Sequence, residues 1–151
     1  ILGAVYAPAF ARLFTGAAHG AHEWQWPVAD DAAHLDLASA RRIAARPSPA
    51  NPIGLWSRSH GKYREDEYRN LYNVGPVRIC GSSLKFCLIA AAEADIYPRH
   101  GTTMEWDTAA GQAVLEAAGG SVSDLFGKAL GYGKAGEKYA NPSFVARGRS
   151  G

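Results

Sequence analysis

One acidic residue stands where a carboxylate could bind a cation. Asp107 lies within EWDTAAG, at residues 105–111, and the small alanines and glycine that follow it leave room for another backbone, a metal ion or a phosphate. A carboxylate oxygen is a ligand of the kind that Mg²⁺ binds in proteins. An exposed aspartate on a core helix explains the same pattern, so from these residues alone both interpretations stay open.

The other candidates are cationic or hydroxyl side chains that follow predicted strands. CGSSLKFC places Ser82 and Lys85 where a strand ends and a helix begins, and the free N–H groups of a helix start attract anions. Arg99 follows a second strand, and SRSHGKYR, which includes His60, follows a third. Ligands bind to α/β proteins at such strand ends, although solvated loops give the same pattern.

The composition excludes several classes of partner. The 151 residues are 47% hydrophobic and 20% charged, with a net charge of +2, which is too small to indicate a nucleic acid polymer or a membrane surface. No apolar run approaches the roughly 20 residues that a membrane span needs, so an integral membrane protein is not expected.

Cys80 and Cys87 lack metal-ligand spacing and are predicted to be small buried side chains. His19 and His22 are predicted to lie on the surface, because no third ligand is near them.

The order of strand and helix signals predicts an α/β fold with a sheet between helices. ILGAVYA and ARLFTGAA predict a β-hairpin. Residues 19–51 are loop-like in composition, except that DLASARRIAA is compatible with a short helix or with a strand that leads into the loop. PIGLWSRSH predicts a strand, and KYREDEYRNLYNVG a surface helix that ends at Gly75. PVRIC, GSSLKFCLIAAAEA and ADIYPR predict a strand–helix–strand unit, which is typical of a layered sheet. GSVSDLF predicts a strand or turn, followed by a glycine-rich loop and a final strand, SFVARG.

The helix that carries Asp107 is predicted to span residues 102–120. Thr102 and Glu105 have the spacing of a capping box, which would put Asp107 in the second turn. Gly119 and Gly120 supply a stop signal. An apolar stripe at helical spacing is predicted to face the core. Its members are Trp106, Ala109, Ala110, Ala113, Val114 and Ala117.

Several segments together resemble one known family. SRSH, GSSLKFCLIAAAEADIYPR and WDTAAGQAVLEAAGG, with LGAVYAPAF near the start and NPSFVARG near the end, resemble the inositol monophosphatase-like, metal-dependent phosphatases. The branch most similar is that of the 3'(2'),5'-bisphosphate nucleotidases of the bacterial CysQ type. The resemblance implies a layered α/β sandwich with a mixed sheet between helices. It also implies an enzyme, cytoplasmic or peripheral to the inner membrane, that uses Mg²⁺ to remove the 3'-phosphate of adenosine 3',5'-bisphosphate.

The resemblance also assigns roles to individual residues. Asp107 matches a metal-ligating aspartate, whereas His60, Ser82, Lys85 and Arg99 match positions that hold the other phosphate and the nucleotide. The family's remaining metal ligands lie on a glutamate pair and a DPxDGT motif, neither of which this sequence contains. The whole chain is therefore expected to be one domain, the C-terminal portion of a larger phosphatase whose N-terminal metal-binding half is absent, and to be inactive alone. An inositol or sugar phosphatase and a non-catalytic nucleotide-phosphate-binding module remain as alternatives.

Overall fold

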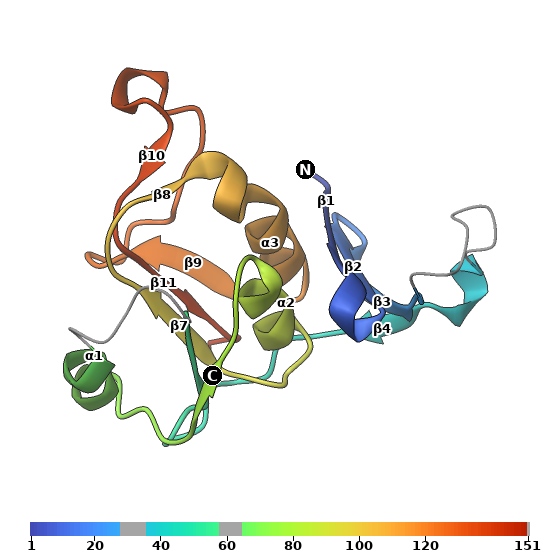
Figure 1. The fold of residues 1–151 in the computed structure, drawn as a ribbon, viewed down its shortest axis with the longest axis horizontal. Helices are drawn as coiled ribbons and strands as arrows, with labels where there is room; N and C mark the ends of the chain where they lie inside the picture. Colours follow the sequence, from blue (N-terminus) through green and yellow to red (C-terminus); the bar gives the residue numbers. More distant parts are fainter. Residues whose placement is uncertain (28–35, 58–64, 151) are drawn as a thin grey trace.

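The computed structural model describes residues 1–27, 36–57 and 65–150, and these form alternating layers of sheet and helix (Figure 1). An N-terminal sheet packs against α2 and α3, a second sheet covers the other side of these helices, and α1 lies beyond it. The predicted α/β architecture is confirmed. The elements are β1 (Gly3–Ala7), the 3-10 helix η1 (Pro8–Phe10), β2 (Arg12–Ala17), β3 (Gly20–Gln25), η3 (Leu37–Ser39), β4 (Arg41–Ile43), β5 (Gly54–Trp56), α1 (Glu65–Leu71), β6 (Val77–Ile79), α2 (Leu84–Ala90), β7 (Ile96–Arg99), β8 (Thr103–Met104), α3 (Glu105–Ala117), β9 (Ser121–Asp124), η4 (Ala135–Glu137), β10 (Ala140–Asn141) and β11 (Phe144–Arg147).

The N-terminal sheet has the strand order β1-β2-β3-β4, and all its pairs are antiparallel. The predicted hairpin is confirmed as β1 and β2. Gly20–Gln25, predicted as loop, instead form β3, whereas the short helix or strand that stayed open around DLASARRIAA is observed as η3 and β4. The sequence does not predict β3 because a charged residue lies on its inward face. Glu23 is 4% exposed and forms ion pairs with Arg12 and Arg41, so the strand does not show the usual apolar alternation.

Small residues allow the N-terminal sheet to approach α3 closely. A Cβ atom added to Gly3 would lie 2.4 Å from the Ala110 carbonyl oxygen, and one added to Gly16 would lie 2.4 Å from the Val114 Cα. On the α2 side, a Cβ added to Gly111 would lie 2.7 Å from the Phe86 ring. The space predicted behind Asp107 is therefore occupied by neighbouring protein. Of the three occupants considered, another backbone, a metal ion and a phosphate, the structure shows another backbone.

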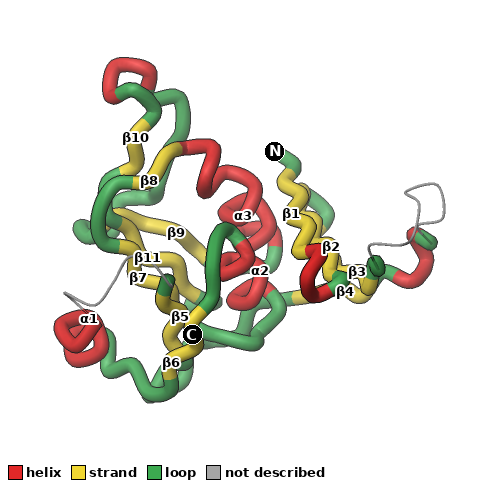
Figure 2. The backbone as a smooth tube through the Cα atoms, in the orientation of Figure 1, coloured by secondary structure: helices red, strands yellow, loops and turns green. Residues whose placement is uncertain are grey.

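The second sheet is mixed and has the strand order β6-β5-β7-β11-β9 (Figure 2). β5 is parallel to β6 and β7, whereas β11 is antiparallel to β7 and β9. The predicted strand–helix–strand unit is confirmed as β6, α2 and β7. The strand predicted in SFVARG is β11, and GSVSDLF forms β9. The helix α1 ends at Leu71, before the predicted stop at Gly75.

The start of α3 differs from the prediction. The capping box of Thr102 and Glu105 is wrong, because Thr103 and Met104 form β8, which pairs with β10, and the helix begins at Glu105. Asp107 therefore lies in the first turn. The predicted apolar stripe is only partly buried: Val114 is buried, but Ala109 is exposed and Trp106 is 67% exposed instead of facing the core. The buried residues of α3 are Thr108, Gly111, Gln112, Val114 and Leu115.

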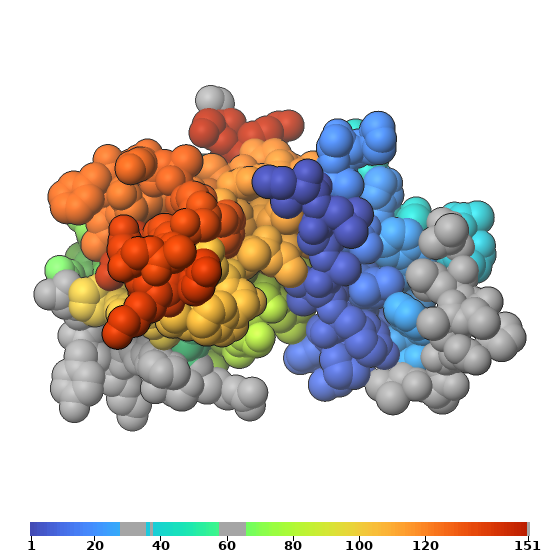
Figure 3. Space-filling view, turned by 90° about the horizontal axis from the view of Figure 1, so that it is seen from above, coloured from blue at the N-terminus to red at the C-terminus, as the bar shows by residue number. Residues whose placement is uncertain are grey.

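The core lies between the two sheets, around α2 and α3. Seen from above, the N-terminal sheet forms one side of the molecule and contacts the part of the chain that includes α3 (Figure 3). Cys87 is fully buried in this core, as predicted, whereas Cys80 is partly exposed, and no disulfide joins them. No helix within the described ranges has the length and apolar character needed to cross a membrane.

Candidate functional site

A cavity of about 490 Å³ lies between the start of α2 and the start of α3. Because β5 is parallel to β6 and β7, the carboxyl ends of these strands meet at one edge of the sheet, and the cavity lies there. Ser82, Lys85, Arg99 and Asp107 all line it, whereas His60 lies outside the described residues. The lining consists of Ser57, Gly81, Ser82, Ser83, Lys85, Phe86, Tyr97, Arg99, Thr103, Trp106, Asp107 and Thr108.

Lys85 lies beneath the loop that leads into α2. Its Nζ donates hydrogen bonds to the backbone oxygens of Cys80 (3.2 Å) and Ser82 (3.0 Å) and lies 4.6 Å from the centre of the Tyr97 ring. The side chain is 2% exposed, and this burial lowers the pKa of Lys85 to about 8, with the charge of Arg99 adding to the effect. The alternative of a solvated lysine is therefore wrong. Lys85 supports the loop from within, beside the cavity.

Arg99 supplies the second positive charge of the cavity. Its Nε is buried and has no hydrogen-bond partner within the part of the chain that the structure describes. A buried donor without a partner is unfavourable, so an anion in the cavity would remove this cost. Next to it, burial raises the pKa of Tyr97, whose hydroxyl is hydrogen-bonded to Ser57. Two cations and neutral hydroxyl groups thus form most of the polar lining, which suits a phosphate.

Asp107 is the acidic residue of the lining, and it is exposed. Its Oδ2 accepts a hydrogen bond from the backbone N–H of Met104 (2.8 Å), so the carboxylate caps the first turn of α3. The neighbouring Trp106 also lines the cavity, with its ring centre 6.4 Å from that of Tyr139. The sequence did not mark Trp106 as a cavity residue, because a tryptophan at helical spacing is more typical of a core.

The described residues provide one carboxylate for a metal ion. Within the described ranges, no cluster of three or more histidine, cysteine, aspartate or glutamate side chains could hold an ion. Asp107 fits the role of a single ligand, because it is exposed and only its Oδ2 has a described hydrogen bond. Magnesium needs several oxygen ligands in near-octahedral geometry. These residues could therefore contribute to a magnesium site but do not complete one.

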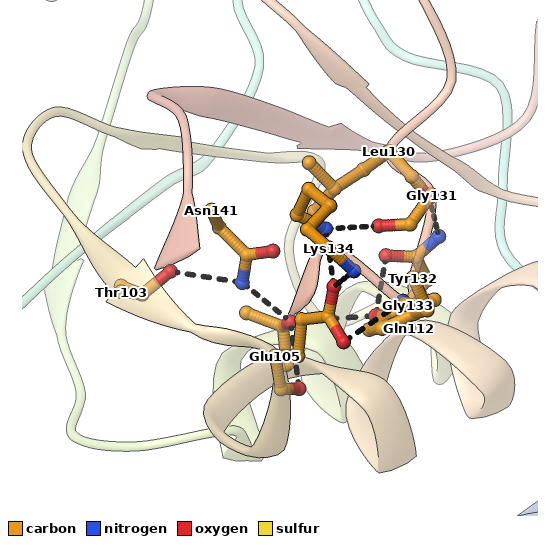
Figure 4. Close-up of polar contacts among 10 residues, drawn as sticks. Thr103, Glu105, Gln112, Leu130, Gly131, Tyr132, Gly133, Lys134 and Asn141 are labelled. Carbon is orange, nitrogen blue, oxygen red and sulfur yellow. Dashed lines mark hydrogen bonds and ion pairs between the residues drawn. The ribbon is translucent and has the colours of Figure 1, made fainter. Parts of the chain in front are cut away.

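A glycine-rich segment lies against the first turn of α3 (Figure 4). The Glu105 carboxylate accepts hydrogen bonds from the backbone N–H groups of Gly133 and Lys134 and forms an ion pair with the Lys134 ammonium at 2.8 Å. The Lys134 side chain, together with these N–H groups, lowers the pKa of Glu105 to about 2. Sequence reasoning gave Glu105 a different role, because a contact with a segment nearly thirty residues away leaves no local pattern.

A second, apolar cavity of about 480 Å³ adjoins the first. The two share Gly81, Ser82 and Ser83, so one loop separates a cationic cavity from an apolar one. The apolar lining comes mainly from β1, η1 and the end of β6, and Phe10 and Ile79 are largely exposed there. A ligand that combines a phosphate with an apolar ring system could contact both cavities.

Comparison with curated proteins shows which enzymes the chain is similar to. It is 40% identical over 144 residues to the 3'(2'),5'-bisphosphate nucleotidase CysQ of Escherichia coli K12, which covers 95% of this chain and 53% of that enzyme. It is 60% identical over 72 residues to an uncharacterized protein in the pss 5' region of Rhizobium leguminosarum, which covers 45% of this chain and 76% of that protein. The chain thus spans about half the length of the nucleotidases it matches.

Solved structures and a family model agree with this result. The crystal structure of CysQ from Bacteroides thetaiotaomicron matches with a TM-score of 0.82 and 31% identity, covering 100% of this chain and 59% of that chain. An inositol monophosphatase from Anabaena shares the fold, with a TM-score of 0.68 and 22% identity over 99% of this chain and 54% of that chain. The model of the inositol monophosphatase family matches residues 1–149. The chain therefore belongs to the inositol monophosphatase family.

Proposed function

We propose that this chain is the C-terminal part of a magnesium-dependent phosphomonoesterase that converts adenosine 3',5'-bisphosphate to AMP and phosphate. In this reaction water adds across the 3' ester: the phosphorus–oxygen bond to the ribose breaks, the ribose oxygen leaves as a hydroxyl, and the water oxygen remains on phosphate. The observation that carries the proposal is that Lys85, Arg99 and Asp107 line one cavity. The relatives named as nucleotidases support it.

The cations account for recognition of the phosphate that is not cleaved. Arg99 has a buried Nε without a partner among the described residues, and a guanidinium binds phosphate oxygens through parallel hydrogen bonds. Lys85 holds the loop that carries Ser82 through its contacts with backbone oxygens, and its positive charge lies beside the same cavity. His60, by the same resemblance, is proposed to contact the nucleotide. The bound nucleotide is thereby oriented relative to Asp107.

On this chain, Asp107 is the residue that we propose to bind the metal ion. A bound magnesium ion would polarise the phosphate oxygens and stabilise the leaving oxygen. Asp107 would supply one ligand, with its orientation fixed by the Met104 N–H. Since the described residues offer no complete set of ligands, we propose that the others, and the residue that activates water, belong to a preceding segment. We infer the same cytoplasmic, or peripheral inner-membrane, location that the resemblance implies.

Three observations test this proposal. The purified 151-residue chain should release little or no phosphate from adenosine 3',5'-bisphosphate, and robust magnesium-dependent release would contradict its incompleteness. The coding sequence upstream of Ile1 should contain a DPxDGT-type motif. A polypeptide that includes this upstream segment should then release phosphate in a magnesium-dependent manner. If the active protein lacked a DPxDGT-type motif, the assignment of the missing ligands would be contradicted.

The apolar cavity favours a nucleotide over the inositol or sugar phosphates that the same family could accept. It shares the 81–83 loop with the cationic cavity, and an adenine base can occupy apolar surface that a polyhydroxylated ring cannot use well. Comparison of phosphate release from adenosine 3',5'-bisphosphate and from inositol monophosphate separates these substrates. Calorimetry with AMP tests the non-catalytic alternative, because metal-independent binding without any turnover in the longer polypeptide would favour a binding module.

A further inference from the structure

A polar network holds the first two turns of α3 (Figure 4). Two of its members, Thr103 and Thr108, also line the cavity, whereas the others do not. The network joins α3 to the glycine-rich segment at residues 130–134 and to β10. Its members come from positions far apart in the sequence, so it forms only when the chain is folded. The residues involved are Thr103, Glu105, Thr108, Gln112, Leu130, Tyr132, Gly133, Lys134 and Asn141.

Glu105 anchors the glycine-rich segment at the helix start. Its Oε2 accepts the N–H of Gly133 (3.0 Å), its Oε1 accepts the N–H of Lys134 (2.9 Å), and the Lys134 ammonium lies 2.8 Å from Oε1. The Glu105 and Lys134 side chains are only 12% and 19% exposed. In the opposite direction, the Glu105 N–H donates to the Tyr139 carbonyl at 2.9 Å. Glu105 is therefore bound on both sides by the segment that returns over the helix.

Thr108 connects this anchor to the body of the domain. Thr108 is 2% exposed. Its hydroxyl donates a hydrogen bond to the Glu105 carbonyl oxygen (3.2 Å) and accepts one from Asn141 Nδ2 (3.0 Å). It also lies 3.3 Å from the Tyr132 hydroxyl, which donates to Gln112 at 2.8 Å. One hydroxyl thus contacts three segments, which gives a structural reason for the threonine in the WDTAAG motif.

The network and the cavity have only Thr103 and Thr108 in common. Thr103, Trp106, Asp107 and Thr108 line the cavity, whereas Glu105, Lys134 and Asn141 do not. The opposite wall, with Lys85 and Arg99, comes from α2 and β7. Any effect of Glu105 or Asn141 on a ligand must therefore act through the position of the α3 wall. This separates a positioning role from direct contact with the ligand.

We propose that Glu105 and Asn141 are positioning residues that fix the α3 wall of the cavity, and thereby the separation between Asp107 and the two cations. The proposal rests on the proposed function for the identity of the ligand, an adenine nucleotide. The structural part of the proposal, that the network fixes the first turn of α3, does not depend on the proposed function. The two parts are therefore measured separately, on the 151-residue chain.

The structural part is tested by amide hydrogen exchange at Met104 and Glu105, measured by NMR. The Met104 N–H donates to Asp107 and the Glu105 N–H to Tyr139, so both amides report on the first turn. We expect Glu105→Ala and Asn141→Ala to accelerate their exchange by roughly 10-fold or more relative to a control. The control is Ile43→Val in the N-terminal sheet, a remote buried change that costs stability without touching the network. Exchange equal to that of the control would overturn the proposal.

The functional part is tested by AMP affinity, measured by calorimetry on the same variants. We expect Glu105→Ala and Asn141→Ala to weaken AMP binding by about 3- to 30-fold and Ile43→Val to leave it unchanged. Glu105→Gln keeps one acceptor oxygen but replaces the other by an NH2 group, which cannot accept a backbone N–H. It should therefore recover only part of each loss, and full recovery would refute the role of the two carboxylate oxygens as acceptors for the Gly133 and Lys134 N–H groups.

The outcomes separate this inference from the proposed function. Faster exchange with unchanged AMP affinity would overturn the positioning role, because the network would then be purely structural. If the unmodified chain does not bind AMP, the nucleotide assignment fails, and the exchange at Met104 and Glu105 alone decides whether the network fixes the first turn. Faster exchange with weaker AMP binding in Glu105→Ala and Asn141→Ala, each only partly recovered in Glu105→Gln, is the expected result.

Discussion

Replacement of Lys85 by methionine should change how the stability of the domain depends on pH. Lys85 is 2% exposed, and burial lowers its pKa from 10.5 to about 8. Below pH 8 the folded and unfolded chains both hold the proton, so the folded state bears the full cost of the buried ammonium. Between pH 8 and 10.5 the unfolded chain binds more protons than the folded one, so stability rises with pH. Methionine carries no charge, so the Lys85→Met variant lacks this contribution to the pH dependence of stability.

The size of the effect follows from the change in pKa. The difference between 10.5 and about 8 corresponds to about 3 kcal/mol, and about 2 kcal/mol of this is regained between pH 7 and pH 10. The free energy of unfolding of the unmodified chain, minus that of Lys85→Met, should therefore increase by about 2 kcal/mol over this range. Titrating groups that do not interact with Lys85 cancel in this difference.

Urea unfolding at pH 7, 8, 9 and 10, followed by tryptophan fluorescence, measures this difference directly. Ile89→Val is the control, because Ile89 lies in the same helix, is fully buried and carries no titratable group. Its stability difference should stay constant with pH. A constant difference for Lys85→Met as well would refute the reasoning, because it would mean that the ammonium of Lys85 remains hydrated in the folded chain.

The remaining predictions concern packing, recognition and the metal. Gly16→Ala should destabilise the chain by about 1–3 kcal/mol, because its Cβ would meet the backbone of Val114, whereas Gly131→Ala, with nothing within 4 Å, should be neutral in the same thermal unfolding assay. Arg99→Ala should weaken AMP binding about 10- to 100-fold in calorimetry, and unchanged affinity would remove Arg99 from the site. Asp107→Asn, in the polypeptide that includes the upstream segment, should lower magnesium-dependent phosphate release by roughly 100-fold or more, with little change in melting temperature because an amide oxygen can still accept the helix-capping N–H.

The strand–helix–strand unit around α2 could be predicted because its signals are local. β6 and β7 are short runs bounded by turn residues, and α2 is an apolar segment that begins after two serines. The same signals led to the cavity, since they placed Ser82 after β6 and Arg99 at the end of β7, the two strands that flank β5. Local pattern was sufficient here because the residues that bound each of these elements lie next to it in the sequence.

The start of α3 and the strand β3 could not be predicted in this way. Thr103 and Met104 form a strand only because β10, more than thirty residues later, pairs with them, and this pairing overrides the capping signal at Thr102. Glu23 faces inward only because arginines from two neighbouring strands neutralise it. Both features depend on contacts that are distant in sequence, and a window of local pattern contains no trace of them.

The structure also changes how Asp107 is interpreted, because its two possible roles do not compete. A carboxylate has two oxygens, and here Oδ2 accepts the Met104 N–H and caps α3. Among the described residues no hydrogen bond to Oδ1 is found, and Asp107 lines the cavity. The hydrogen bond from the Met104 N–H restricts the rotation of the Asp107 side chain. An ion that binds Oδ1 therefore does not have to order this side chain, and the entropic cost of binding is smaller. An aspartate that stabilises the helix start is thereby also a preorganised ligand, and this explains why a structural pattern and a metal-binding motif coincide at one residue.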